Sequence, residues 1–141
     1  MTSLVLWHGW GMSPSVWDTL IAELRAVMPD DVRYDAIPLP GYDATALPDG
    51  TPLACWADAM AASIGEPVVL CGWSMGAILA LQAAARHPDK VERLVLFGGT
   101  PCFAAKADWE CGMRRDTGDA FRQGVQSDAK TTLRRFISLF N

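Results

Sequence analysis

The strongest constraint on the fold is a glycine-flanked turn between two apolar segments. Gly72-Trp73-Ser74-Met75-Gly76 stands between the apolar run Val68–Cys71 and the Ala- and Leu-rich segment Met75–Arg86. The short run predicts a buried strand, and the longer segment predicts a helix that ends at His87-Pro88. Because glycine accepts conformations and close approaches that larger residues do not, the chain can pass from strand to helix in a very tight turn.

The first two-thirds of the chain repeats this alternation of short apolar runs and helical patterns. Three further runs predict strands, at Leu4–Trp7, Val32–Ile37 and Leu94–Phe97. Ser13-Pro14 and Thr51-Pro52 each join a capping residue to a proline at the first helical position, so each predicts a helix start. The second of these helices is expected to reach about Ile64, with Gly65 as its C-terminal glycine. This order predicts an α/β fold, with a mostly parallel sheet and helices on both faces.

The pattern changes in the last third of the chain. Residues 103–118 are irregular, and residues 119–140 have the apolar spacing of a helix. Gly124 and Ser127-Asp128 are expected to divide that helix in two. No further strand is indicated, so a lid or cap distinct from the sheet is expected here.

We therefore expect two parts, residues 1–102 from the sheet domain and residues 103–141 from the beginning of a helical cap. The first part holds 5 basic and 11 acidic side chains, and the second holds 7 basic and 5 acidic ones. The basic excess of the second part indicates either an ordinary solvated helical surface or a docking face for an acidic partner.

Composition excludes several classes of protein. No run of about 18 apolar residues predicts a membrane span, and the N-terminus lacks the pattern of a signal peptide, so we expect a cytoplasmic protein. No feature predicts nucleic-acid binding. The cysteines form no CxxC pair and lie far from both histidines in the sequence, so free thiols and no metal site are expected. They are Cys55, Cys71, Cys102 and Cys111.

Ser74 is the candidate nucleophile. A tight turn after a strand lifts its hydroxyl above the sheet at a helix N-terminus, where partial positive charge favours an anionic intermediate. The alternative is an ordinary glycine-rich turn with Ser74 as the helix cap. His8-Gly9-Trp10-Gly11 follows the first strand, and acyl transfer needs two N–H donors for the oxyanion. Met75 and Trp10 are the candidate donors, although these glycines could simply turn the chain.

A serine nucleophile also needs a histidine base and an acid that orients it, and the sequence offers neither in a suitable place. No histidine follows His87, which stands at the far end of the helix, roughly 20 Å from Ser74. His8 beside the glycine loop is expected to be structural. The chain is therefore the N-terminal part of a longer enzyme, one of two polypeptides that form a site, or a non-catalytic relative. We favour the first interpretation.

Several segments together resemble the α/β-hydrolase superfamily. Within it, they are similar to the esterases that hydrolyse pimeloyl-[acyl-carrier protein] methyl ester in biotin synthesis. The segments are Leu6–Met12, Leu39–Tyr42, Gly72–Gly76, His87–Val91, Thr100–Phe103, Asp108-Trp109 and Arg134–Leu139.

The resemblance implies an α/β-hydrolase sheet with an inserted helical cap, a serine carboxylesterase reaction and no cofactor or metal. It also implies an acyl-carrier protein as partner and favours the docking interpretation of the basic cap. Ser74 is implied as nucleophile, with Trp10 and Met75 at the oxyanion and substrate site. The implied acyl-facing cap residues are Phe136, Ile137, Ser138, Leu139 and Phe140, although the family usually has glutamine at the last position. The implied carrier-binding residues are Arg114, Arg115, Arg122, Arg134 and Arg135.

Two other functions stay open at this point. A general short-chain carboxylesterase would use the same serine and oxyanion donors. A catalytically inactive protein that binds an acyl carrier would account for the missing base and the basic cap.

Overall fold

A computed structural model describes residues 1–50 and 52–138 of the chain. Its centre is a four-stranded sheet in the order β2-β1-β3-β4, in which every pair of neighbours is parallel. The strands are β1 (Ser3–Trp7), β2 (Arg33–Ile37), β3 (Val68–Trp73) and β4 (Val91–Phe97). The predicted parallel sheet is therefore confirmed. Strands β1, β3 and β4 are longer than the predicted apolar runs by one to three residues, and β2 begins one residue later than predicted.

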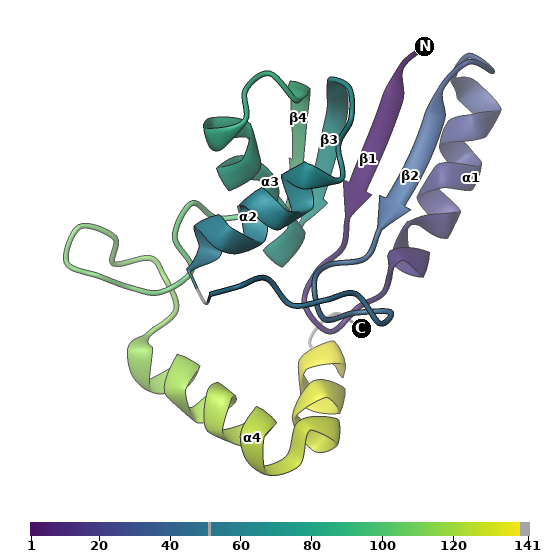
Figure 1. The fold of residues 1–141 in the computed structure, drawn as a ribbon. Helices are drawn as coiled ribbons and strands as arrows, with labels where there is room; N and C mark the ends of the chain where they lie inside the picture. The colour runs from purple at the N-terminus through teal and green to yellow at the C-terminus, as the bar shows by residue number, and fades with distance from the viewer. Residues whose placement is uncertain (51, 139–141) are drawn as a thin grey trace. The chain divides into compact units, whose positions relative to one another are not determined.

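Helices cover both faces of this sheet, as Figure 1 shows. Helices α2 and α3 lie over one face, and α1 lies against the other, beside β2. The helical elements are η1 (Pro14–Trp17), α1 (Asp18–Val27), α2 (Leu53–Ala62), α3 (Met75–Arg86) and α4 (Arg115–Ile137). No helix within the described ranges is long and apolar enough to cross a membrane.

The alternation of side chains along the strands produces two separate cores. Val5 of β1 and Leu70 of β3 point to the face that α2 and α3 cover. Their neighbours Leu6 and Cys71 point to the opposite face, where they pack with Trp17. Since successive strand residues face opposite sides, strands buried on both faces must be apolar throughout, which is the pattern that predicted them.

The helix ends differ from the sequence expectations. The helix expected after Ser13 begins as the 3-10 turn η1, and the Ser13 hydroxyl bonds the Ser15 hydroxyl at 2.6 Å instead of capping a backbone amide. The prediction that α2 reaches Ile64 and ends on Gly65 is wrong, because the helix ends at Ala62. Thr51, the expected cap of α2, lies outside the described residues.

Lys90 stabilises the end of α2. Its Nζ donates hydrogen bonds to the carbonyl oxygens of Ala61 at 2.8 Å and Ile64 at 2.9 Å. A lysine near a helix C-terminus satisfies carbonyls that the helix leaves without partners. A side chain from the α3–β4 connection thus performs the role that the sequence assigned to a local glycine.

The chain forms two compact units, Met1–Pro101 and the residues from Cys102 onward. In the second unit, α4 begins at Arg115, earlier than expected, and runs through Gly124 without a break. The helix is interrupted at Asp128, whose φ of −152° and ψ of 82° are not helical. The Asp128 carboxylate then accepts a hydrogen bond from the Thr131 amide at 3.0 Å, as an N-cap does for the second half.

Candidate active site at the carboxyl end of β3

Ser74 occupies a strained turn between β3 and α3. Its φ of 54° and ψ of −116° lie in a region that non-glycine residues rarely adopt. The turn is held from both sides. The Ser74 amide donates to the Phe97 carbonyl at 2.9 Å, and its own carbonyl accepts the amides of Ala77 and Ile78 at 3.0 and 3.1 Å. Strain held by such surroundings is typical of functional positions.

The two flanking glycines are sterically required. A Cβ on Gly72 would overlap the Gly76 carbonyl oxygen, and a Cβ on Gly76 would overlap the Trp7 carbonyl oxygen. Gly72 lets α3 start directly after β3 in a tight turn. Gly76 lets α3 approach β1. The motif read from the sequence therefore corresponds to two specific backbone contacts.

The glycine loop after β1 borders Ser74. Strands β1 and β3 are paired in parallel with Trp7 beside Gly72, so the segments that follow them lie at the same edge of the sheet. A Cβ on Gly9 would lie 3.3 Å from the Cβ of Ser74. Trp10 follows Gly9 and Met75 follows Ser74, so the structure brings the segments of both candidate oxyanion donors together. As the first residue of α3, Met75 has an amide with no partner inside the helix.

His8 and Tyr42 position the glycine loop. The fully buried His8 ring accepts the Leu39 amide at Nε2, 3.1 Å away, and lies 2.8 Å from the Gly9 carbonyl at Nδ1. The hydrogen bonds therefore assign the proton to Nδ1. Burial lowers the pKa of His8 and favours this neutral ring. The Tyr42 hydroxyl accepts the Gly11 amide at 2.8 Å. A structural role was expected for His8 from the sequence, whereas no role was expected for Tyr42.

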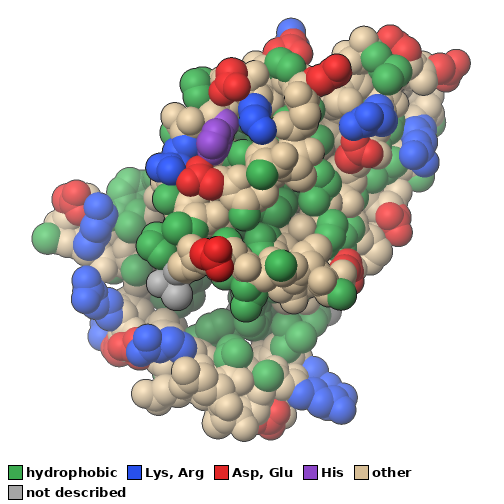
Figure 2. Space-filling view, in the orientation of Figure 1, with side chains coloured by type: hydrophobic (Ala, Val, Ile, Leu, Met, Phe, Trp, Pro, Cys, Tyr) green, Lys and Arg blue, Asp and Glu red, His purple; other side chains and the backbone are tan. Residues whose placement is uncertain are grey.

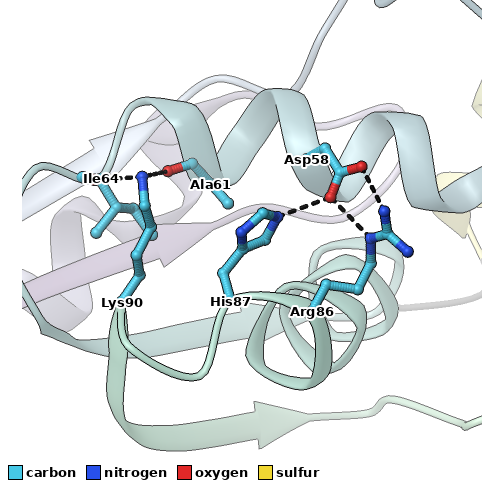
Figure 3. Close-up of polar contacts among 6 residues, drawn as sticks. All are labelled: Asp58, Ala61, Ile64, Arg86, His87 and Lys90. Atoms are coloured by element: carbon cyan, nitrogen blue, oxygen red, sulfur yellow. Dashed lines mark hydrogen bonds and ion pairs between the residues drawn. The ribbon is translucent and has the colours of Figure 1, made fainter.

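His87 belongs to a different cluster, at the opposite end of α3. Its Nε2 lies 2.7 Å from the Asp58 carboxylate, which also accepts two hydrogen bonds of 2.7 Å from Arg86 (Figure 3). The three side chains are partly exposed. Figure 2 shows a histidine next to basic and acidic side chains on the surface in this region. The hydrogen bonds from Arg86, and then from His87, hold the pKa of Asp58 well below its usual range.

Neither histidine is in place to act as the base. His87 follows Ser74 by 13 positions, at the other end of α3, which corresponds to about 20 Å. Among the described residues, no hydrogen bond joins either histidine to Ser74. The same residues contain no group of three or more His, Cys, Asp and Glu side chains that could hold a metal ion.

The remaining candidate residues belong to the second unit. Phe136 packs against Phe121 with ring centroids 5.7 Å apart, and Ile137 ends α4. Ser138 donates its hydroxyl to the Arg135 carbonyl at 2.7 Å. Leu139 and Phe140 lie outside the described residues.

The five candidate arginines are all exposed. Arg114 pairs with Asp116 at 2.7 Å, and Arg122 pairs with Asp119 at 3.1 Å. Within residues 1–50 and 52–138, no ion pair of 4.0 Å or less engages the others, Arg115, Arg134 and Arg135.

Comparison with known proteins gives one family and a consistent set of relatives. The model of the alpha/beta hydrolase family matches residues 4–140. A pimeloyl-[acyl-carrier protein] methyl ester esterase of Aromatoleum aromaticum is 41% identical, over 96% of this chain and 54% of its own length. The enzyme of the same name from Pectobacterium carotovorum is 33% identical, over 98% of this chain and 52% of its own length. The chain therefore spans about half the length of the curated relatives it matches.

Solved structures show the same architecture. A hydrolase from Oleispira antarctica has a TM-score of 0.77 at 18% identity, over 94% of this chain and 50% of its own. A carboxylesterase structure from Nitrososphaera gargenis has a TM-score of 0.70 at 23% identity, over 94% of this chain and 47% of its own. At these identities the likeness concerns the fold alone.

Proposed function

Since the chain belongs to the alpha/beta hydrolase family, we propose that it supplies the nucleophile and oxyanion donors of a carboxylic ester hydrolase. The proposed substrate is the methyl ester of a pimeloyl group on an acyl-carrier protein, as in the names of the relatives. The observation that carries the proposal is the strained Ser74 between β3 and α3, flanked by two glycines at which a Cβ would overlap backbone atoms. A structural turn would not need a serine in this conformation, because glycine would adopt it at lower cost.

The reaction follows from the positions of three residues. The Ser74 Oγ attacks the ester carbonyl carbon, and its proton passes to a base. The carbonyl oxygen becomes an oxyanion that accepts hydrogen bonds from the main-chain amides of Met75 and Trp10. Methanol leaves with the proton that the base returns. Water then attacks the acyl-enzyme, releases the carboxylic acid and restores the Ser74 hydroxyl.

The base and its orienting acid form part of the proposal. His8 has both ring nitrogens in contacts with the backbone, and His87 is bound to Asp58 at the far end of α3. The relatives are about twice as long as the matched region. We therefore assign the base and its acid to polypeptide other than these residues, and expect the chain alone to have little or no esterase turnover.

The acyl-carrier protein is the proposed partner of the second unit. Its basic side chains outnumber the acidic ones, by 7 to 5 in residues 103–141. Arg115, Arg134 and Arg135 are the best candidates for contacts with acidic carrier side chains, because Arg114 and Arg122 already pair with aspartates. The assignment of Phe136–Phe140 to the acyl chain and the cytoplasmic location both stay predictions.

A chimera tests this function directly. Residues 1–141 are fused to the remaining half of the Aromatoleum aromaticum relative, and methanol release from the carrier-bound methyl ester is measured. We expect turnover that Ser74→Ala lowers by about 10⁴-fold or more, because a triad acts as a unit. The control Ser13→Ala removes an exposed hydroxyl and leaves turnover unchanged.

Three outcomes contradict the proposal. Turnover by residues 1–141 alone, abolished by Ser74→Ala, would show that the base is present in this chain. A chimera that binds the carrier but has no turnover would favour the non-catalytic alternative. Faster turnover of simple aryl esters than of the carrier-bound ester would favour a general short-chain esterase.

A further inference from the structure

The indole ring of Trp73 adjoins the glycine loop that carries Trp10. Trp73 ends β3, directly before Ser74, and its side chain packs against the core that contains Trp17. A Cβ on Gly9 would lie 3.2 Å from Cε3 and 3.4 Å from Cζ3 of the Trp73 ring. Gly9 therefore rests against the six-membered part of the indole, in a contact that an added methyl group would crowd.

The five-membered part of the same indole adjoins the end of β4. A Cβ on Gly98 would lie 3.8 Å from both Cδ1 and Nε1 of Trp73, which is an ordinary van der Waals distance. The Ser74 amide donates to the carbonyl of Phe97, the residue before Gly98, at 2.9 Å. Since β1 and β4 flank β3 in the sheet, Trp73 joins the segments that follow both neighbouring strands, next to the turn that carries Ser74.

The Gly9 carbonyl group fixes the direction of the next amide. Its oxygen lies 2.8 Å from His8 Nδ1 and accepts a hydrogen bond of 3.3 Å from the Met12 amide. Because a trans peptide is planar, the N–H of Trp10 points away from this oxygen. The hydrogen bonds therefore set the direction of the Trp10 N–H, and the indole against Gly9 sets how close this peptide comes to Ser74.

We propose that Trp73 is a positioning residue, whose indole holds the Gly9–Trp10 peptide where the Trp10 amide can donate to the oxyanion. The inference rests on the proposed function, because an oxyanion forms only if Ser74 attacks an ester. The position of the amide, in contrast, is a property of the folded chain and requires no catalysis. With a smaller side chain at position 73, Gly9 loses its support and the amide moves. A displacement of about 1 Å in such a group lowers turnover by about 10²-fold.

The first measurement concerns the full chain by itself. Residual dipolar couplings from nuclear magnetic resonance report the orientation of each backbone N–H, and the loss of an indole ring current does not affect them. We expect Trp73→Leu to change the coupling of the Trp10 N–H and to leave the couplings in α2 and α3 unchanged. Ile21→Ala is the matched control, because Ile21 packs in the same core, whereas the atoms nearest to a Gly9 Cβ belong to Trp73 and Ser74. It should leave the Trp10 coupling unchanged.

The second measurement uses the chimera with the Aromatoleum aromaticum half. Trp73→Leu should lower kcat for the carrier-bound methyl ester by about 10²-fold. It should leave KM nearly unchanged, because the oxyanion accepts its hydrogen bonds only in the transition state. Ile21→Ala should change neither constant. Trp73→Phe keeps a smaller aromatic ring and should give an intermediate loss of kcat, and it replaces Trp73→Leu in both measurements if that variant does not fold.

Gly9→Ala alters the same contact from the side of the loop. The added methyl group crowds the Trp73 ring and also lies 3.3 Å from the Cβ of Ser74. In Trp73→Leu the first of these contacts is relieved, so the loss of kcat in the double variant should be smaller than the product of the two single losses. Losses that multiply would mean that the two residues act independently, contrary to the proposal.

Three further results would overturn the inference. One is a Trp10 coupling that stays the same in Trp73→Leu, and another is an equal loss of kcat in Trp73→Leu and Ile21→Ala. The third is a rise in KM at constant kcat, which would mean that Trp73 contributes to substrate binding and not to the position of the amide. An inactive chimera together with a displaced Trp10 amide fails only the proposed function. An active chimera whose Trp10 amide is not displaced by Trp73→Leu fails only the inference.

Discussion

At the amino end of α3, Ser74 is held in a strained conformation, and no histidine among the described residues is hydrogen-bonded to it. At the carboxyl end, His87 is bound to the Asp58 carboxylate. A serine, a histidine and an aspartate are the residue types of a hydrolase triad. Ser74 and His87 flank α3, and Asp58 lies on the neighbouring α2. Yet about 20 Å along the helix separates Ser74 from His87. Residue types alone therefore do not define a site, because the distance between the side chains decides whether they can act together.

The two ends of α3 also differ in how their contacts affect the stability of the fold. At the amino end, close backbone approaches and a positive φ cost stability and expose a reactive group. At the carboxyl end, Asp58 receives hydrogen bonds from Arg86 and His87, so α2 and α3 are tied together. The first arrangement is expected of a functional site and the second of a structural contact. This contrast predicts different responses to substitution.

The largest effect is expected for Gly76→Ala. The added Cβ would overlap the Trp7 carbonyl oxygen, so α3 would have to move away from β1. We expect the free energy of unfolding to fall by about 3 kcal/mol or more, as for severe overpacking. Urea denaturation of the chain measures it. Gly65→Ala is the control, because its Cβ would meet nothing within 4 Å. Equal effects of the two substitutions would mean that the close approach of α3 to β1 is wrong.

An effect of opposite sign is expected at Ser74. Glycine adopts a positive φ without the steric cost of a Cβ, so Ser74→Gly should raise the free energy of unfolding by about 1–2 kcal/mol. Ser74→Ala keeps the Cβ, and so keeps the strain, while it removes the hydroxyl. Parallel urea titrations of the two variants separate these contributions. If Ser74→Gly is no more stable than Ser74→Ala, the strain is absent and the case for a functional turn is weakened.

How much the sequence could predict depends on the distance along the chain between the residues that form each feature. The strands and the turn at Ser74 depend on residues close together in the chain, such as the apolar run before Gly72 and the glycine after Met75. Those features were predicted with small errors in length. The contact of Lys90 with Ile64 joins residues 26 positions apart, and that of Tyr42 with Gly11 joins residues 31 apart. No local pattern encodes such pairs, so the end of α2 and the support of the glycine loop were missed.

The smallest effect is expected at the carboxyl end of α3. The folded-state pKa of Asp58 lies below its usual range, first because of Arg86 and then because of His87. A lowered carboxyl pKa contributes stability above the unfolded-state pKa of about 4, and the contribution is lost as the pH falls below that value. Asp58→Asn should therefore lower the denaturation midpoint slightly at neutral pH, and the difference from the unsubstituted chain should close in acid.

Urea titrations across this pH range, with Asp30→Asn of the exposed turn after α1 as the control for lost charge, measure the difference. The substitution should leave turnover of the chimera unchanged, because Asp58 and His87 lie at the other end of α3 from Ser74. A large loss of turnover in a variant that remains folded would mean that this pair acts on the nucleophile, and the contrast between the two ends of α3 would fail. A stability difference that stays constant into acid would instead mean that Asp58 contributes by packing and not by its charge.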